Sequence, residues 1–138
     1  MSEIKFTETN IIATDGTPLR LLYDQDADML EIFFGQNAPA TGITLTDHIV
    51  LRIDQNSKRA ISLLLLHFSI LTEQTEYGPR NFALEKLTDL PNDLRALVLQ
   101  IILSSPVNEF LKLSQLHSPK RKSIPLTYVE ARPLAIAA

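Results

Sequence analysis

The stretch HIVLRIDQNSKRAISLLLLHFSIL, residues 48–71, contains the patterns on which the predicted fold rests. Its first part alternates, because Ile49, Leu51 and Ile53 fall on one side while Val50 and Arg52 fall on the other. A period of two is typical of a β-strand, so residues 48–54 predict one. The polar residues 55–58 predict a turn. Residues 59–71 then predict a second, longer strand.

This longer strand is apolar on both faces. One face carries Ile61, Leu63 and Leu65. The other begins with the polar Ser62 and continues with Leu64, Leu66, Phe68 and Ile70. A strand that is apolar on both faces has to be covered on both, and the second cover needs either another layer or another copy of the protein. The pattern therefore predicts an oligomer, while a helix over residues 61–71 is the alternative that periodicity leaves open.

The residues before this stretch predict further strands. Asp15 and Gly16 lie between the apolar segments 11–13 and 19–23, and an Asp-Gly pair in this position predicts a β-hairpin. Residues 29–34 alternate and predict a strand. Residues 35–42, which include Pro39, predict a loop.

The second half of the chain predicts helices. Pro91 suits a first helical turn, Asp93 complements the positive end of the helix, and apolar residues follow at helical spacing: Leu94, Leu97, Val98, Ile101 and Ile102. We expect the helix to stop at Ser105-Pro106, where a shorter helix begins with Ser105 as its N-cap and Phe110, Leu111 and Leu113 as its apolar contacts. Residues 115–123 predict an exposed loop, and residues 124–129 predict a late strand.

These elements predict an α+β fold in a single domain, residues 1–138. A β-rich half, residues 1–72, forms an antiparallel sheet as a meander of short strands, and residues 73–138 supply a helical cover with a late strand. The chain has 138 residues, 45% of them hydrophobic, and a formal net charge of −3. A chain of this composition is expected to fold.

Composition also excludes several classes of function. The chain has no cysteine, which excludes disulfides, a thiol nucleophile and a cysteine-based metal centre. Its pI near 5.5 makes nucleic acid an unlikely partner. The apolar runs 61–71 and 94–103 fall short of the roughly 18–20 residues that span a bilayer. The first residues lack a secretory signal, so we expect a cytoplasmic protein that is not inserted in a membrane.

Residues 23–32, YDQDADMLEI, resemble the opening motif of a small bacterial family known as domain of unknown function 2283. Its members show Tyr-Asp-x-x-Ala-Asp-x-Leu-x-Ile followed by two strands, and residues 49–54 and 61–64 match those positions. Ser57, Ala60 and Ser62 stand where the family has two glycines and a glutamate. The resemblance covers residues 19–71 and implies a small antiparallel sheet with no established activity.

Three acidic residues of that motif, Asp24, Asp26 and Asp28, occupy alternate positions. A calcium loop would also need glycine at its sixth position and glutamate at its twelfth, where this chain has Met29 and Gly35. We therefore interpret these carboxylates as acceptors of backbone N–H groups in a turn. The predicted structural turn residues are Tyr23, Asp24, Asp28 and Asp54.

The three histidines, His48, His67 and His117, lie in separate segments, and no pair has helical i, i+4 spacing. The sequence therefore predicts no metal site and no cofactor. An enzyme or metal-dependent protein remains an alternative, with Asp24, Asp28, His48 and His67 as weak catalytic candidates. This alternative predicts that at least two of the four side chains converge in one pocket.

The leading hypothesis is a non-enzymatic interaction or structural domain that forms a homodimer. Its basis is the doubly apolar strand and the lack of a recognisable catalytic set. The basic run Lys120, Arg121 and Lys122 is expected to be a solvated loop, with contact to a partner as the alternative. A regulatory partner of the antitoxin type is a further hypothesis suggested by that run and by the small size of the chain.

Overall fold

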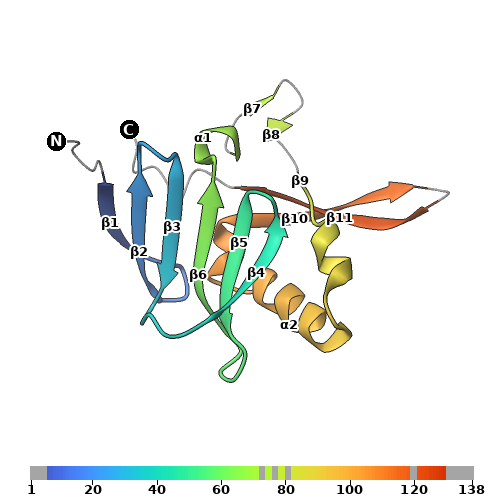
Figure 1. Ribbon diagram of the computed structural model, residues 1–138, viewed down its shortest axis with the longest axis horizontal. Coiled ribbons are helices and arrows are strands. Elements are labelled where there is room, and N and C mark those ends of the chain that lie inside the picture. Colours follow the sequence, from blue (N-terminus) through green and yellow to red (C-terminus); the bar gives the residue numbers. More distant parts are fainter. Residues whose placement is uncertain (1–5, 72–73, 76–77, 80–81, 119–120, 130–138) are drawn as a thin grey trace.

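The computed structural model describes residues 6–71, 74–75, 78–79, 82–118 and 121–129 (Figure 1). Its main element is a six-stranded antiparallel sheet. The strands are β1 (Phe6–Ile12), β2 (Pro18–Asp24), β3 (Met29–Phe34), β4 (Thr41–Thr46), β5 (Ile49–Asp54) and β6 (Arg59–Leu66). The antiparallel sheet predicted for the first half of the chain is therefore confirmed.

The order of the strands differs from the predicted meander. It is β1-β2-β3-β6-β5-β4, so two three-stranded meanders join where β3 pairs with β6. The prediction of one continuous meander was wrong. This arrangement places the most apolar strand, β6, in the interior of the sheet, where neighbours on both sides shield it from water.

The hairpin at Asp15-Gly16 is confirmed. Ala13 N–H donates to the carbonyl oxygen of Thr17 and Gly16 N–H donates to that of Ala13, both at 2.9 Å. Gly16 has a φ of 90°, a value that glycine adopts without the steric cost of a side chain. On its other side β2 pairs with β3, and there Leu19 lies opposite Phe34.

The strand predicted for residues 59–71 is too long. β6 ends at Leu66, His67 has a φ of 56°, and Phe68–Leu71 form the short helix α1. A positive φ turns the backbone out of the extended conformation. Phe68 and Ile70 therefore do not lie on the second face of the strand.

The rest of the chain contains short elements and one longer helix. They are β7 (Gln74–Thr75), β8 (Gly78–Pro79), β9 (Phe82–Ala83), the 3₁₀ helices η1 (Glu85–Asp89) and η2 (Val107–Glu109), α2 (Asn92–Ile102), β10 (Leu111–Ser118) and β11 (Arg121–Val129). β10, β11 and β9 form a second antiparallel sheet, and β7 pairs with β8. The helix predicted after Pro91 is confirmed as α2.

Three local predictions in this part of the chain were wrong. The second helix is only the 3₁₀ turn η2, without a side-chain cap from Ser105. The loop predicted for residues 115–123 is largely the end of β10 and the start of β11, of which the late strand 124–129 forms part. Residues 41–42 begin β4 rather than close a loop. In the last two cases pairing sets the strands, β10 with β11 and β4 with β5, and local periodicity does not report such pairing.

α2 and the segments around it pack on one side of the six-stranded sheet (Figure 1). The core joins residues from the sheet, including Leu21, Ile32, Leu51 and Leu63, to Val98, Ile102 and Phe110 of the helical segment. The molecule is therefore mostly sheet, with its helix on the C-terminal side. Within the described residues, no helix is both long and apolar enough to cross a membrane.

Candidate functional site

The two faces of the six-stranded sheet differ in exposure. On the α2 side, Leu21, Ile32, Leu51 and Leu63 are completely buried. The opposite side, here called the open face, is less covered. Cross-strand pairing groups its central residues, most of them partly exposed: Arg20, Leu22, Glu31, Phe33, Val50, Arg52, Ser62 and Leu64.

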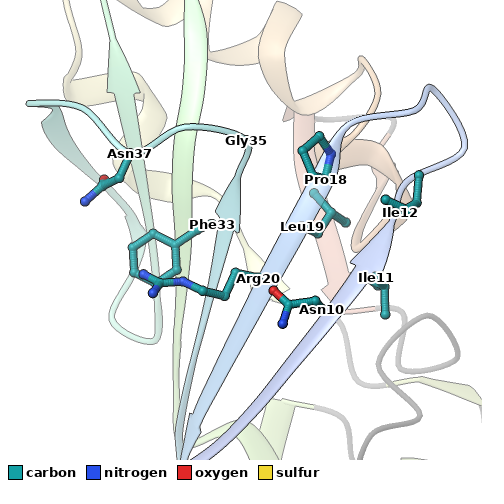
Figure 2. Close-up of a pocket in the computed structure, with 9 residues that line it drawn as sticks. All are labelled: Asn10, Ile11, Ile12, Pro18, Leu19, Arg20, Phe33, Gly35 and Asn37. Carbon is teal, nitrogen blue, oxygen red and sulfur yellow. The ribbon is translucent and has the colours of Figure 1, made fainter.

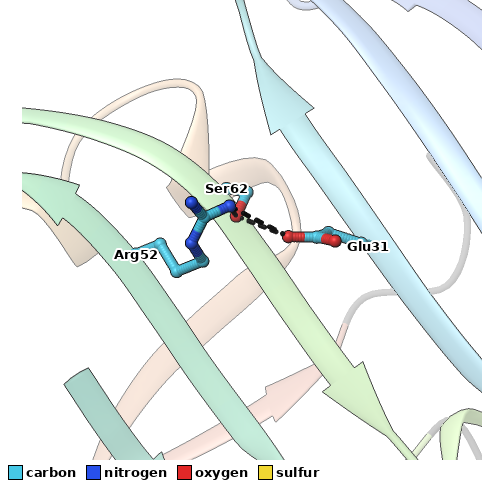
Figure 3. Close-up of polar contacts among 3 residues, drawn as sticks. All are labelled: Glu31, Arg52 and Ser62. Carbon is cyan, nitrogen blue, oxygen red and sulfur yellow. Dashed lines mark hydrogen bonds and ion pairs between the residues drawn. The ribbon is translucent and has the colours of Figure 1, made fainter. Parts of the chain in front are cut away.

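A polar cluster lies in the middle of the open face (Figure 3). The Ser62 hydroxyl donates to Glu31 Oε2 at 2.8 Å, and Arg52 Nη1 lies 3.1 Å from Ser62 Oγ and 3.4 Å from Glu31 Oε2. Register explains the contacts, because Arg52 pairs directly with Ser62, and Glu31 lies two residues along β3 from Phe33, the residue of β3 that pairs with Ser62. Ser62 is fully buried, so the cluster satisfies its hydroxyl and places opposite charges side by side.

A shallow depression of about 460 Å³ adjoins this cluster at the β1–β2 end of the open face. Figure 2 shows the Arg20 guanidinium over the Phe33 ring, 4.5 Å from its centre, which is a cation–π contact. Arg20 also lies 3.9 Å from Glu8. The lining residues are Asn10, Ile11, Ile12, Pro18, Leu19, Arg20, Phe33, Gly35 and Asn37.

Three of the four weak catalytic candidates gather at the other end of the sheet, where the β2–β3 turn, the β4–β5 turn and the end of β6 meet. We call this region the histidine end and define it by Tyr23, Asp28, His48, His67 and Ser69. The Nδ1 atoms of His48 and His67 lie 2.9 Å apart, with ring centres separated by 4.9 Å and ring planes at 83°. One ring must donate and the other accept, because a lone pair can bind only to an N–H.

Asp28 anchors α1 to the β2–β3 turn. Its carboxylate accepts hydrogen bonds from the Ser69 N–H, the Ser69 hydroxyl and the Tyr23 hydroxyl, and its backbone oxygen accepts from Phe68 N–H. Partial burial opposes ionisation, but the hydrogen bonds from Ser69 and Tyr23 outweigh it and lower the pKa of Asp28. Burial, followed by contact with Asp28, raises the pKa of Tyr23.

This arrangement is better suited to holding structure than to proton transfer. The Ser69 hydroxyl donates a hydrogen bond to the Asp28 carboxylate, whose pKa is lowered. A carboxylate with a lowered pKa is a weak general base near neutral pH. Asp24 is not part of the cluster, because its Oδ1 accepts from the N–H groups of Asp26 and Ala27. The depression beside Arg20 is also separate, since Phe33 lies near the opposite end of β3 from Met29.

The remaining predicted residues lie elsewhere. Asp54 accepts from Asn56 N–H at 3.0 Å and from the Ser57 hydroxyl at 2.9 Å in the β5–β6 turn, and these hydrogen bonds lower its pKa. Arg121 and Lys122 begin β11, at the far end of a hairpin that projects from the body of the molecule (Figure 1). Lys120 is outside the described residues.

The sequence did not single out Glu31 and Arg52 as partners. In the sequence, both stand out as charged residues within otherwise apolar, alternating strands. Among the described residues, no group of three or more His, Asp or Glu side chains is arranged to hold a metal ion. Comparison of the chain with protein-family models, curated proteins and solved structures finds no match.

Proposed function

We propose that this chain is a non-enzymatic interaction domain that forms a homodimer through the open face of its sheet. The observation that carries the proposal is the Glu31–Ser62–Arg52 cluster, set between the half-buried apolar side chains of Val50 and Leu64. A charged pair that is already hydrogen-bonded loses less on being covered than an isolated charge does. The face can therefore be buried against a partner.

Charge complementarity favours a second copy as that partner. A twofold interface brings the same patch from both subunits together, so the patch has to complement itself. The open face meets this condition, because Arg20 and Arg52 are matched by Glu8 and Glu31. Apolar neighbours of these charges, such as Leu22 and Leu64, would form the dry part of the interface.

β6, the strand predicted to be apolar on both faces, supports the same proposal, although its second face is shorter than predicted. With Phe68 in α1, the second face of β6 consists of Ser62, Leu64 and Leu66. Leu64 and Leu66 are partly exposed in one chain, and removing such apolar surface from water favours association with a partner. That residues 19–71 are related to domain of unknown function 2283 is a separate proposal, which rests on the sequence motif.

Sedimentation equilibrium tests the proposal. We expect the full chain at micromolar concentration to have twice its 15.5 kDa mass. Leu64→Glu on the open face should give a folded monomer, because two added carboxylates would face each other across the interface. Ala96→Glu, on the exposed side of α2, is the matched control and should remain a dimer.

Two outcomes would contradict the proposal. A wild-type chain that stays monomeric across the micromolar range removes the dimer altogether. A dimer that persists in Leu64→Glu, with circular dichroism showing a native fold, uses some surface other than the open face.

A further inference from the structure

The histidine pair brings two identical ring atoms into contact from separate parts of the chain. His48 lies between β4 and β5, and His67 lies directly after β6. Their Nδ1 atoms are 2.9 Å apart. In the neutral rings one Nδ1 carries the proton and donates it in a hydrogen bond, and the other Nδ1 accepts with its lone pair.

A divalent transition-metal ion can take the place of that proton. Nitrogen ligands bind such ions at about 2.0–2.1 Å, so two of them at a right angle lie about 2.9 Å apart, and two at a tetrahedral angle about 3.4 Å apart. The observed spacing of 2.9 Å matches the right angle. Right-angled nitrogen pairs are typical of the square-planar or tetragonal sites of Cu²⁺ and Ni²⁺.

The backbone holds both histidines in place. His48 N–H donates to Thr46 Oγ1 at 3.0 Å, and the His48 carbonyl accepts from Leu66 N–H at 2.8 Å. The His67 carbonyl accepts from Ile70 N–H and Leu71 N–H in α1. These hydrogen bonds hold the two Cα positions, so both Nδ1 atoms stay within reach of one ion.

His67 also has an unusual backbone conformation. Its φ of 56° lies in a region that non-glycine residues seldom occupy. Two sets of hydrogen bonds hold His67 in this conformation: those within α1, and the one that Phe68 N–H donates to the Asp28 carbonyl. His67 is exposed, so an ion can approach it from solvent.

We propose that His48 and His67 together bind one Cu²⁺ or Ni²⁺ ion through their Nδ1 atoms. Because the described residues supply no third His, Asp or Glu ligand, water completes the coordination. The Nδ1 proton of the donating ring moves to its own Nε2 through solvent, so the neutral pair binds the ion without losing a proton overall.

Titration of the full chain with CuCl₂ at pH 7.5, in a buffer that does not bind copper, tests this site. We expect saturable binding of one ion per chain by calorimetry, and electron paramagnetic resonance that shows coupling to two nitrogens. His48→Gln and His67→Gln should each weaken binding at least about tenfold, since each removes one of two ligands.

His117→Gln is the matched control, because it removes the only other histidine and should leave the affinity unchanged. Circular dichroism of each variant separates loss of a ligand from loss of the fold. The proposal is overturned if folded His67→Gln binds copper as tightly as the wild type, or if His117→Gln weakens binding equally. The sedimentation result for Leu64→Glu does not bear on this site, so the two proposals fail separately.

Discussion

Asp28 accepts hydrogen bonds from both the N–H and the hydroxyl of Ser69, although 41 positions separate the two residues. The hydroxyl contact is 2.5 Å long, which is short, as expected when a carboxylate is the acceptor. Through it the β2–β3 turn and the helix after β6 become one unit. The same unit positions His67 beside His48.

We expect Asp28→Asn to lower the free energy of unfolding by about 1–2 kcal/mol, since it replaces charge-assisted hydrogen bonds by neutral ones. Asparagine tolerates the positive φ of 54° at this position, so the backbone is not the cause. Asp26→Asn, at an exposed position of the same turn, should change stability by less than about 0.5 kcal/mol. Urea denaturation measures both, and equal effects would contradict the anchoring role of Asp28.

The lowered pKa of Asp54 predicts how acid affects the β5–β6 turn. Because the folded state favours the charged carboxylate, its stabilising effect is present above the pKa of unfolded aspartate, about 3.9, and is lost as the pH falls through the lower folded value. The urea midpoint of the wild type should therefore fall more between pH 6 and pH 3 than that of Asp54→Asn. If the urea midpoints of the two proteins fall equally with pH, Asp54 does not contribute to the loss of stability in acid.

Ile102 and Leu103 are neighbours at the end of α2 with opposite environments, 1% and 58% exposed. Ile102→Ala should destabilise the fold by about 2–5 kcal/mol, because it leaves a cavity in the core between the helix and the sheet. Leu103→Ala should stay within about 0.5 kcal/mol of the wild type. Thermal or urea unfolding of this pair tests whether α2 covers the sheet in solution, and similar losses would contradict it.

Two glycines provide a test of the β1–β2 hairpin. Gly16→Ala should cost about 1–2 kcal/mol, because a φ of 90° is unfavourable for any residue with a side chain. The space around it is open, so any loss reports backbone conformation alone. Gly42→Ala should be neutral or stabilising, since Gly42 does not have a positive φ and a Cβ there makes ordinary contact with Val50 at 3.9 Å. Comparison of the two unfolding midpoints distinguishes these effects.

The elements that depend on neighbouring residues could be predicted from the sequence. Alternation gave β3 with its bounds at Met29 and Phe34, and the buried side of β5. Asp15-Gly16 gave the hairpin, and helical spacing after Pro91 gave α2. Each of these follows from local physics, because a period of 2 or 3.6 and a residue that tolerates positive φ are visible within a few positions.

Features that depend on pairing between strands follow from the tertiary structure. It ended β6 at Leu66, where the Phe68 N–H donates to the Asp28 carbonyl in the β2–β3 turn, and it paired β11, the partner of residues 111–118, with the distant strand β9. It also paired β3 with β6 and β6 with β5, which brought Glu31, Ser62 and Arg52 together, and the β5–β6 pairing placed His48 beside His67. The physical reason is that hydrogen bonds between strands form across the sheet, so the order of the strands, and not local periodicity, determines which side chains meet.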